Sequence, residues 1–285
     1  VLLCAVPLHA VDWNLKHNAQ NPETPLTHNC WFSDGGLSSN FPIQFFDAPI
    51  PGRPTFGINL RSFDDTYAES PDERNNVWMP EFNDDVISNS RNGFDDKGAN
   101  LPGFLSAIID TMQNWNDNLQ AQVPGFRDRI VHVFLSAAEG GLNLDMPENV
   151  LATLSRRGEC AGDLLVQRFT SPSPEAPPQT TNWENHRWVR FRTATSVLEQ
   201  FVVDFTTRYL APPDNGDTAY PDLVQRKPGV APFGYALGVP EQQRFVAAQT
   251  AALASSGIVW ANAAPNDFRE DSPEPMPELQ VRPRI

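Results

Sequence analysis

The run Arg129-Ile130-Val131-His132-Val133-Phe134-Leu135 restricts the fold of this chain more than any other stretch. It is almost continuously β-branched, aromatic or aliphatic, which is typical of strands buried on both faces. Glu139-Gly140-Gly141 then predicts a turn, and Asp145, Pro147 and Glu148 have the spacing of a helix start. A buried strand, a glycine turn and a helix in succession form an α/β unit, so we expect an α/β fold.

Other stretches predict further strands and helices. Alternation of apolar and smaller residues over 55–60 predicts a strand, and the apolar residues 1–8 predict another. Apolar residues spaced by three and four predict amphipathic helices over 100–119 and 184–209. Pro240 predicts the start of a last, alanine-rich helix over 241–256, and Gly257 its end.

Helical periodicity also predicts which side chains face the core. For the helix that follows Glu148, the expected inner residues are Val150, Leu151, Leu154, Ala161, Leu165 and Phe169. For the helix over 184–209, they are Trp188, Phe191, Leu198, Phe201, Val202, Phe205 and Tyr209.

Charge and cysteine content exclude several classes of function. The chain has 21 basic and 35 acidic residues and a net charge of -14, which argues against nucleic-acid binding and against strong electrostatic binding to an anionic membrane. Three cysteines, Cys4, Cys30 and Cys160, have no metal-ligand spacing, so packed thiols and a reducing compartment such as the cytoplasm are favoured. Residues 1–8 are too few to span a bilayer, so we expect at most peripheral membrane contact.

The stretch Trp31-Phe32-Ser33-Asp34-Gly35-Gly36-Leu37-Ser38-Ser39-Asn40-Phe41-Pro42 is the strongest candidate for chemistry. Asp34 follows an apolar pair that predicts a strand end, and two glycines permit backbone angles that other residues resist. Such a turn presents a carboxylate at the edge where α/β sheets build their sites. A bare Asp-Gly-Gly is more often a structural turn, but the downstream Asn and Pro make this one more specific.

This string, together with Phe45-Phe46-Asp47 and the strand predicted over 55–60, resembles the second catalytic block of the patatin-like phospholipases. The resemblance implies a partial three-layer fold with a central, mostly parallel sheet and flanking helices, and a serine–aspartate dyad without histidine, metal or cofactor. It implies that Asp34 is the dyad carboxylate, that Gly35 and Gly36 shape its turn, and that Asn40 and Pro42 complete the motif. The implied substrate is a lipid or another acyl ester.

The other half of such a dyad is absent from the sequence. No Gly-x-Ser-x-Gly occurs in the 285 residues, and the stretch 234–238 has the outer glycines but Ala236 in place of the nucleophile. The family carries its nucleophile before the aspartate, so we expect the serine upstream of Val1. The chain is then the aspartate half of a carboxylic ester hydrolase and is inactive alone.

The resemblance also implies how the chain is divided into segments. Residues 1–264 are expected to form the C-terminal portion of a patatin-like domain, with a loop-rich insertion at about 61–99 and a proline-rich connector at 171–183. Residues 9–30 are turn-rich and predict a surface connection. Residues 265–285 combine prolines and charges with few apolar residues, which predicts a disordered tail.

Other chemical groups have simpler interpretations. His132 lies inside the buried run, so a neutral, hydrogen-bonded core histidine is favoured over a catalytic base, and Glu139 is a minor site candidate because of its turn. Arg187, Arg190 and Arg192 could form a phosphate strip, but solvated or ion-paired side chains are favoured. His9, His17 and His28 lack the regular spacing of a metal site.

Two alternative functions remain open. The first is a non-catalytic lipid-binding or interaction protein on a degenerate patatin-like scaffold, in which Asp34 is only a turn residue. The second is a metal-dependent hydrolase built on the acidic pairs at 64–65, 84–85 and 95–96, although the alternation and closing glutamate of an EF-hand loop are absent.

Overall fold

The computed structural model describes the helices, strands and connections of most of the chain. The residues described are 6–13, 15–32, 41–87, 121–136, 138–139, 143, 145–170, 177–213, 217–225, 237, 239–263 and 267–277. The helix predicted over 100–119 and the residues from Asp34 to Asn40 lie outside them.

Two compact units divide the chain. Unit 1 contains residues 1–47, 53–122 and 126–183, and unit 2 contains residues 48–52, 123–125 and 184–285. The proline-rich connector predicted at 171–183 ends at the last residue of unit 1, because residues from Glu184 onward belong to unit 2. That residues 1–264 form the C-terminal portion of one patatin-like domain stays a prediction.

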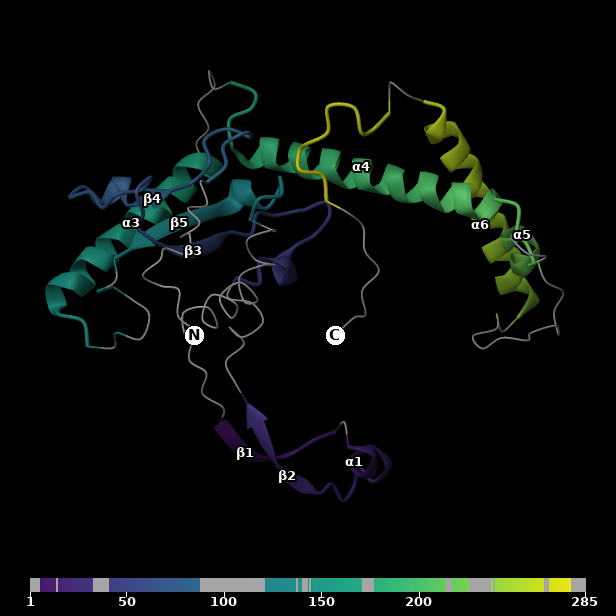
Figure 1. Ribbon diagram of the computed structural model, residues 1–285, viewed down its shortest axis with the longest axis horizontal. Coiled ribbons are helices and arrows are strands. Elements are labelled where there is room, and N and C mark those ends of the chain that lie inside the picture. Colours follow the sequence, from purple (N-terminus) through teal and green to yellow (C-terminus); the bar gives the residue numbers. More distant parts are fainter. Residues whose placement is uncertain are drawn as a thin grey trace, which may run out of the picture. The chain divides into compact units, whose positions relative to one another are not determined.

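Unit 1 begins with a two-stranded antiparallel ribbon of β1 (Val6–Val11) and β2 (Thr27–Phe32), with α1 (Lys16–Gln20) between them (Figure 1). Asn18 on α1 is fully buried, where its amide donates to the carbonyl oxygens of Asp12 and Leu26 and accepts from the amide of Leu26. Residues 9–30 lie at the surface as predicted, with Asn18 the only buried residue among those described, but they form strands and a short helix and not an irregular connection.

The central sheet of unit 1 confirms the α/β class. Its strand order is β3 (Gly57–Ser62), β5 (Ile130–Leu135) and β4 (Val77–Trp78), with β3 parallel and β4 antiparallel to β5. Short 3₁₀ turns η2 (Ile43–Phe46), η3 (Glu73–Asn75) and η4 (Arg127–Arg129) connect these elements. The buried strand predicted at 129–135 is confirmed as the middle strand.

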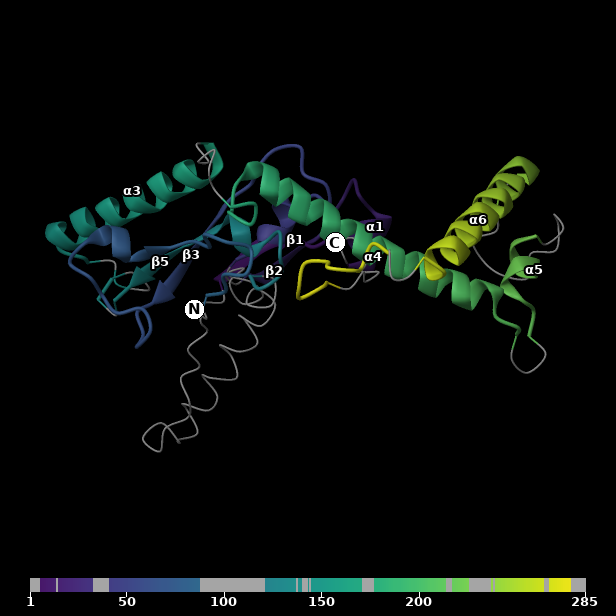
Figure 2. The same ribbon diagram turned by 90° about the horizontal axis from the view of Figure 1, so that it is seen from above.

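Helix α3 (Glu148–Thr170) packs against β4 and β5, and two perpendicular views place it alongside the sheet (Figures 1 and 2). The predicted inner residues Ala161 and Phe169 are buried, but Leu151 is half exposed. The hydrophobic core they join consists of Val77, Met79, Val131, Val133, Cys160, Ala161 and Phe169, flanked by Leu135, Leu164, Leu165 and Trp183. Cys160 is thus a packed core thiol, as expected.

Unit 2 consists of α4 (Trp183–Leu210, in this unit from Glu184), α5 (Tyr220–Val224) and α6 (Pro240–Ala261). Helix α6 crosses the carboxyl-terminal half of α4 (Figure 1), where Gly257 approaches so closely that a Cβ would lie 2.0 Å from Thr206 Oγ1. The predicted helix end at Gly257 was wrong. This glycine serves close helix packing within α6 and does not end the helix.

Helix α4 buries a different face from the one predicted. Trp188, Phe191, Leu198 and Phe201 are exposed, although Val202 and Tyr209 are buried as expected. The opposite face buries the polar and charged residues His186, Arg190, Thr193, Ser196, Glu199 and Thr206. Apolar spacing on one side of the helix therefore did not identify its packed side. Arg190 has a partner in the carbonyl oxygen of Ala48, whereas Thr193 Oγ1 and Thr206 Oγ1 are buried without a hydrogen-bond partner among the described residues.

No helix among the described residues has both the length and the apolar character required to span a bilayer.

His132 on β5 is a core histidine, as the sequence predicted. Its ring is 2% exposed, lies 5.6 Å from the Trp78 ring and accepts a 3.4 Å hydrogen bond at Nδ1 from the Asn59 amide. Burial lowers the pKa of His132 to about 3, and the positive charge of Arg61 acts in the same direction. The imidazole is therefore neutral in the folded chain at neutral pH.

We expect His132 to make the fold sensitive to acid. Its folded pKa lies below the ordinary value of about 6.5, so below pH 6.5 the unfolded chain binds a proton that the folded chain excludes. The free energy of unfolding should fall by about 2–3 kcal/mol between pH 7 and pH 4 from this group alone.

Urea unfolding of the wild type and of His132→Gln at both pH values measures this effect. The variant should lose less stability over this interval than the wild type. His17→Gln is the matched control, because that side chain is exposed. An unchanged pH dependence in His132→Gln would contradict the assignment.

Candidate functional site

The proposed catalytic motif is only partly within the described residues. Asp34, Gly35, Gly36 and Asn40 lie outside them, whereas β2 ends at Phe32 and Pro42 directly precedes η2. Trp31 and Phe32, the apolar pair predicted to end a strand, are the last residues of β2, and residues 33–40 lie outside the described part of the chain. That strand pairs antiparallel with β1, not with the parallel strands of the central sheet.

The downstream end of the motif is anchored to the amino-terminal edge of the central sheet. A Cβ at Gly57 would lie 2.2 Å from the Phe41 ring, so only glycine lets this ring pack at the start of β3. Arg129, which is 2% exposed, forms a 2.8 Å ion pair with Asp47 and donates to Thr55 Oγ1. These contacts join the segment after the motif to the starts of β3 and β5.

The carboxyl-terminal edge of β5 carries a buried ionic cluster of Glu73, Glu139 and Arg157. Arg157 on α3 is fully buried and donates from Nε to Glu73 at 2.5 Å and from Nη1 to Glu139 at 2.8 Å. The same Nη1 donates at 2.6 Å to the carbonyl oxygen of Phe134. One guanidinium therefore links η3, β5, the turn after β5 and α3.

Both carboxylates of this cluster have further partners. Glu139 accepts from the Ser136 amide at 2.9 Å, and Glu73 accepts from the Asn76 side chain at 2.9 Å. Burial alone would raise the pKa of Glu139, but the bonds from Arg157 and Ser136 outweigh it and lower the pKa. Glu139, a minor site candidate from the sequence, is therefore a charged structural partner of Arg157.

The acidic pairs of the loop-rich region form turns. Asp64 accepts from the amides of Thr66 and Tyr67, and Asp85 accepts from those of Glu81 and Phe82. Within the described part of the chain, no three His, Cys, Asp or Glu side chains gather as metal ligands. The third pair, at 95–96, lies outside that part.

Two stretches of the sequence have the glycine spacing of a nucleophile elbow, and the structure describes one of them. Gly234, Ala236 and Gly238 lie outside the described residues. Gly158-Glu159-Cys160-Ala161-Gly162 has the Gly-x-Cys-x-Gly spacing, but it lies in the middle of α3. Cys160 is buried in the core there, so it is not a nucleophile on a strand-to-helix turn.

The three arginines on α4 have separate protein partners, in line with the ion-paired interpretation that the sequence favoured over a phosphate strip. Arg187 pairs with Glu184 at 3.3 Å, and Arg190 is buried and donates to the carbonyl oxygen of Ala48. Arg192 donates to the carbonyl oxygen of Glu270. Arg190 and Arg192 are two positions apart on α4 and therefore point in different directions.

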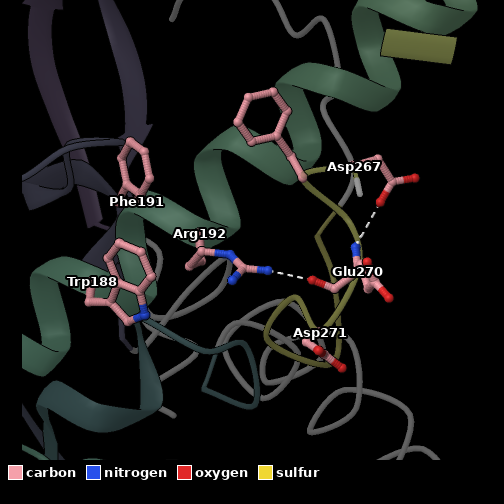
Figure 3. A pocket seen from close by; sticks show the side chains of 7 residues that line it. Trp188, Phe191, Arg192, Asp267, Glu270 and Asp271 are labelled. Carbon is pink, nitrogen blue, oxygen red and sulfur yellow. Dashed lines mark hydrogen bonds between the residues drawn. The ribbon is translucent and has the colours of Figure 1, made fainter. Parts of the chain in front are cut away.

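A pocket of about 440 Å³ lies in unit 2, between α4 and the segment 267–271. Its lining residues are Trp188, Phe191, Arg192, Asp267, Phe268, Glu270 and Asp271 (Figure 3). The sequence did not predict this pocket, because residues 265–285 were expected to be a disordered tail. Residues 267–277 instead contact α4.

An ion pair outside the pocket lining also joins the segment 267–277 to α4. Arg269 Nε lies 3.4 Å from Glu199 Oε2, an ion pair between the start of the segment and α4. Burial and the nearby Asp267 carboxylate raise the pKa of Glu199, which is 1% exposed. A single buried carboxylate on α4 thus fixes the start of the segment.

Arg157→Ala is predicted to lower the free energy of unfolding by about 3–5 kcal/mol, because it leaves two carboxylates without their buried cation. The adjacent Arg156 is the matched control, since its pair with Glu159 is exposed on both sides. Arg156→Ala should cost less than about 1 kcal/mol. Equal losses for the two variants in urea unfolding would contradict the structural role of the cluster.

Comparison with known proteins finds a relative that is longer than this chain. No family model matches the sequence, and no solved structure matches it. A Rhizobium meliloti (strain 1021) protein named RpoH suppressor is 38% identical over 266 residues, which cover 89% of this chain. The chain spans 38% of the length of that relative, so the relative contains a large additional portion.

Proposed function

We propose that this chain supplies the aspartate half of a serine–aspartate acyl hydrolase of the patatin-like type. The observation that carries the proposal is a sequence motif: an apolar pair is followed by Asp34-Gly35-Gly36 and then by Asn40 and Pro42. The parallel pair of β3 and β5 supports the parallel sheet of such a fold, whereas β2, which precedes Asp34, pairs antiparallel with β1. The proposed architecture is the three-layer fold of that family, with this chain contributing its C-terminal portion.

In the proposed reaction, a serine hydroxyl attacks the ester carbonyl while Asp34 orients the hydroxyl and accepts its proton. The alcohol leaves with a proton, and water then hydrolyses the acyl-enzyme and restores the serine. A positioned carboxylate is sufficient because activation requires a base within hydrogen-bond reach, and not an imidazole in particular.

The nucleophile is proposed to lie in sequence that precedes Val1. The 285 residues contain no Gly-x-Ser-x-Gly, and the relative from Rhizobium meliloti is much longer than the matched region. A protein of that length has room for the serine and for the backbone amides that would stabilise the oxyanion.

A second candidate is a non-catalytic lipid-binding or interaction protein on the same scaffold. The observation that favours it is the exposed apolar row of α4, which includes Trp188, Phe191 and Phe201. Exposed aromatic side chains in a row are typical of contact surfaces. In this function, Asp34 only shapes a turn.

Asp34→Asn in a longer form of the protein, extended upstream of Val1, separates the two functions. The hydrolase proposal expects kcat/KM for a nitrophenyl ester to fall roughly 10²–10⁴-fold, because the general base is lost. Asp65→Asn is the matched control, since Asp65 is exposed. The 285-residue chain alone should not hydrolyse the ester.

Two results would contradict the hydrolase proposal. One is an Asp34→Asn variant of the longer form that is less stable but has unchanged ester turnover, which would favour the non-catalytic function. The other is ester turnover by the 285-residue chain alone that Asp34→Ala abolishes, because the serine would then lie within this sequence.

A further inference from the structure

We propose that the pocket of unit 2 binds a zwitterionic group that joins an alkylated ammonium to a phosphate, as in phosphocholine. The pocket combines aromatic rings, an arginine and carboxylates around a volume of about 440 Å³ (Figure 3). This inference does not depend on the proposed acyl hydrolase function, because none of its residues belongs to the motif at 31–42.

The aromatic side of the pocket suits an alkylated cation. The Trp188 and Phe191 rings stack with their centroids 5.7 Å apart, and they are 57% and 40% exposed. Rings with accessible faces attract cations through their quadrupoles, and they also pack against methyl groups. Trp188 already interacts with one cation, since Arg192 Cζ lies 6.0 Å from the centroid of its ring.

The acidic side of the pocket adds negative charge for the ammonium. Asp267 is occupied, because it accepts from the amides of Arg269 and Glu270 and pairs with the Arg269 side chain. Glu270 and Asp271 line the pocket and are exposed at the surface. In Figure 3 these two residues lie across Arg192 from the aromatic rings, so their carboxylates add negative charge to the opposite side of the pocket.

Arg192 explains why a zwitterion fits better than a simple cation. In Figure 3 its guanidinium lies between the two aromatic rings and the acidic segment, and it donates to the carbonyl oxygen of Glu270. A guanidinium has five N–H donors, so others remain for a phosphate oxygen. A lone organic cation would be repelled by Arg192, whereas a zwitterion can pair each of its charges.

Side chains that are not proposed to touch the ligand hold the segment 267–277 in place. Glu199 binds the start of the segment, and Ser196 Oγ on α4 donates to Met276 Sδ at 2.9 Å. The Trp260 ring on α6 meets Phe268 edge to face at 5.5 Å. The acidic wall is therefore positioned before a ligand binds, which reduces the entropy cost of binding.

Isothermal titration of the 285-residue chain with phosphocholine tests the proposal. We expect a dissociation constant of about 1 mM, and binding at least about tenfold tighter than that of choline or inorganic phosphate alone. The isostere 3,3-dimethylbutyl phosphate, which has carbon in place of the ammonium nitrogen, should bind more weakly than phosphocholine. Equal binding of this isostere and phosphocholine would show apolar contact only and would overturn the proposal.

Substitutions in the pocket test which side chains bind phosphocholine. Trp188→Leu should weaken phosphocholine binding roughly 5- to 30-fold, and Glu270→Gln combined with Asp271→Asn should weaken it to a similar extent. Asparagine is chosen because Asp271 has a φ of 52°, a left-handed conformation that asparagine tolerates. Asp204→Asn, exposed on the same helix, and Trp13→Leu, exposed in unit 1, are matched controls.

The outcomes separate the possible sources of the group. Trp188-dependent binding to phosphatidylcholine vesicles but not to phosphatidylglycerol vesicles would assign a lipid headgroup, and binding to phosphocholine alone would assign a soluble ligand. Circular dichroism confirms that each variant folds. No phosphocholine binding at 20 mM (roughly 20 times the expected dissociation constant), or pocket variants that bind like the controls, would overturn the proposal.

Discussion

The structure of unit 1 depends on the buried guanidinium of Arg157. A charge without solvent must be fully paired, and Arg157 reaches Glu73, Glu139 and the carbonyl oxygen of Phe134 at once. Because these partners come from separate parts of the chain, α3 can dock on the sheet only when η3 and the turn after β5 are also in place. The cluster thus couples local elements that have little hydrophobic surface of their own, such as the two-residue strand β4.

Unit 2 buries a second ionisable side chain, with fewer partners than Arg157 has. Glu199 on α4 binds the start of the segment 267–277, and that segment supplies the acidic wall of the pocket. The polar face of α4 is buried, and its aromatic face is left at the surface, where Trp188 and Phe191 line the same pocket. A helix that is polar on its packed side is therefore free to present aromatic side chains to a ligand or partner.

Hydrophobic pattern predicted the elements that are held by apolar packing. The buried strand at 130–135 and the helix after Glu148 were predicted because their burial depends on their own side chains. Arg157 and Glu199 were not predicted as buried, since a charged residue is buried only when its partners are present, and those are distant in sequence. The pocket was missed for the same reason, and the motif around Asp34 rests on its sequence because it lies outside the described residues.

The central functional claim is a serine nucleophile that acts with Asp34 and lies outside these 285 residues. Labelling a longer form of the protein with a fluorophosphonate, followed by mass spectrometry of the labelled peptide, tests it most directly. The proposal predicts one labelled serine in sequence before Val1, with labelling strongly reduced in Asp34→Asn. A labelled serine within the 285 residues, or labelling that is unchanged in Asp34→Asn, would contradict it.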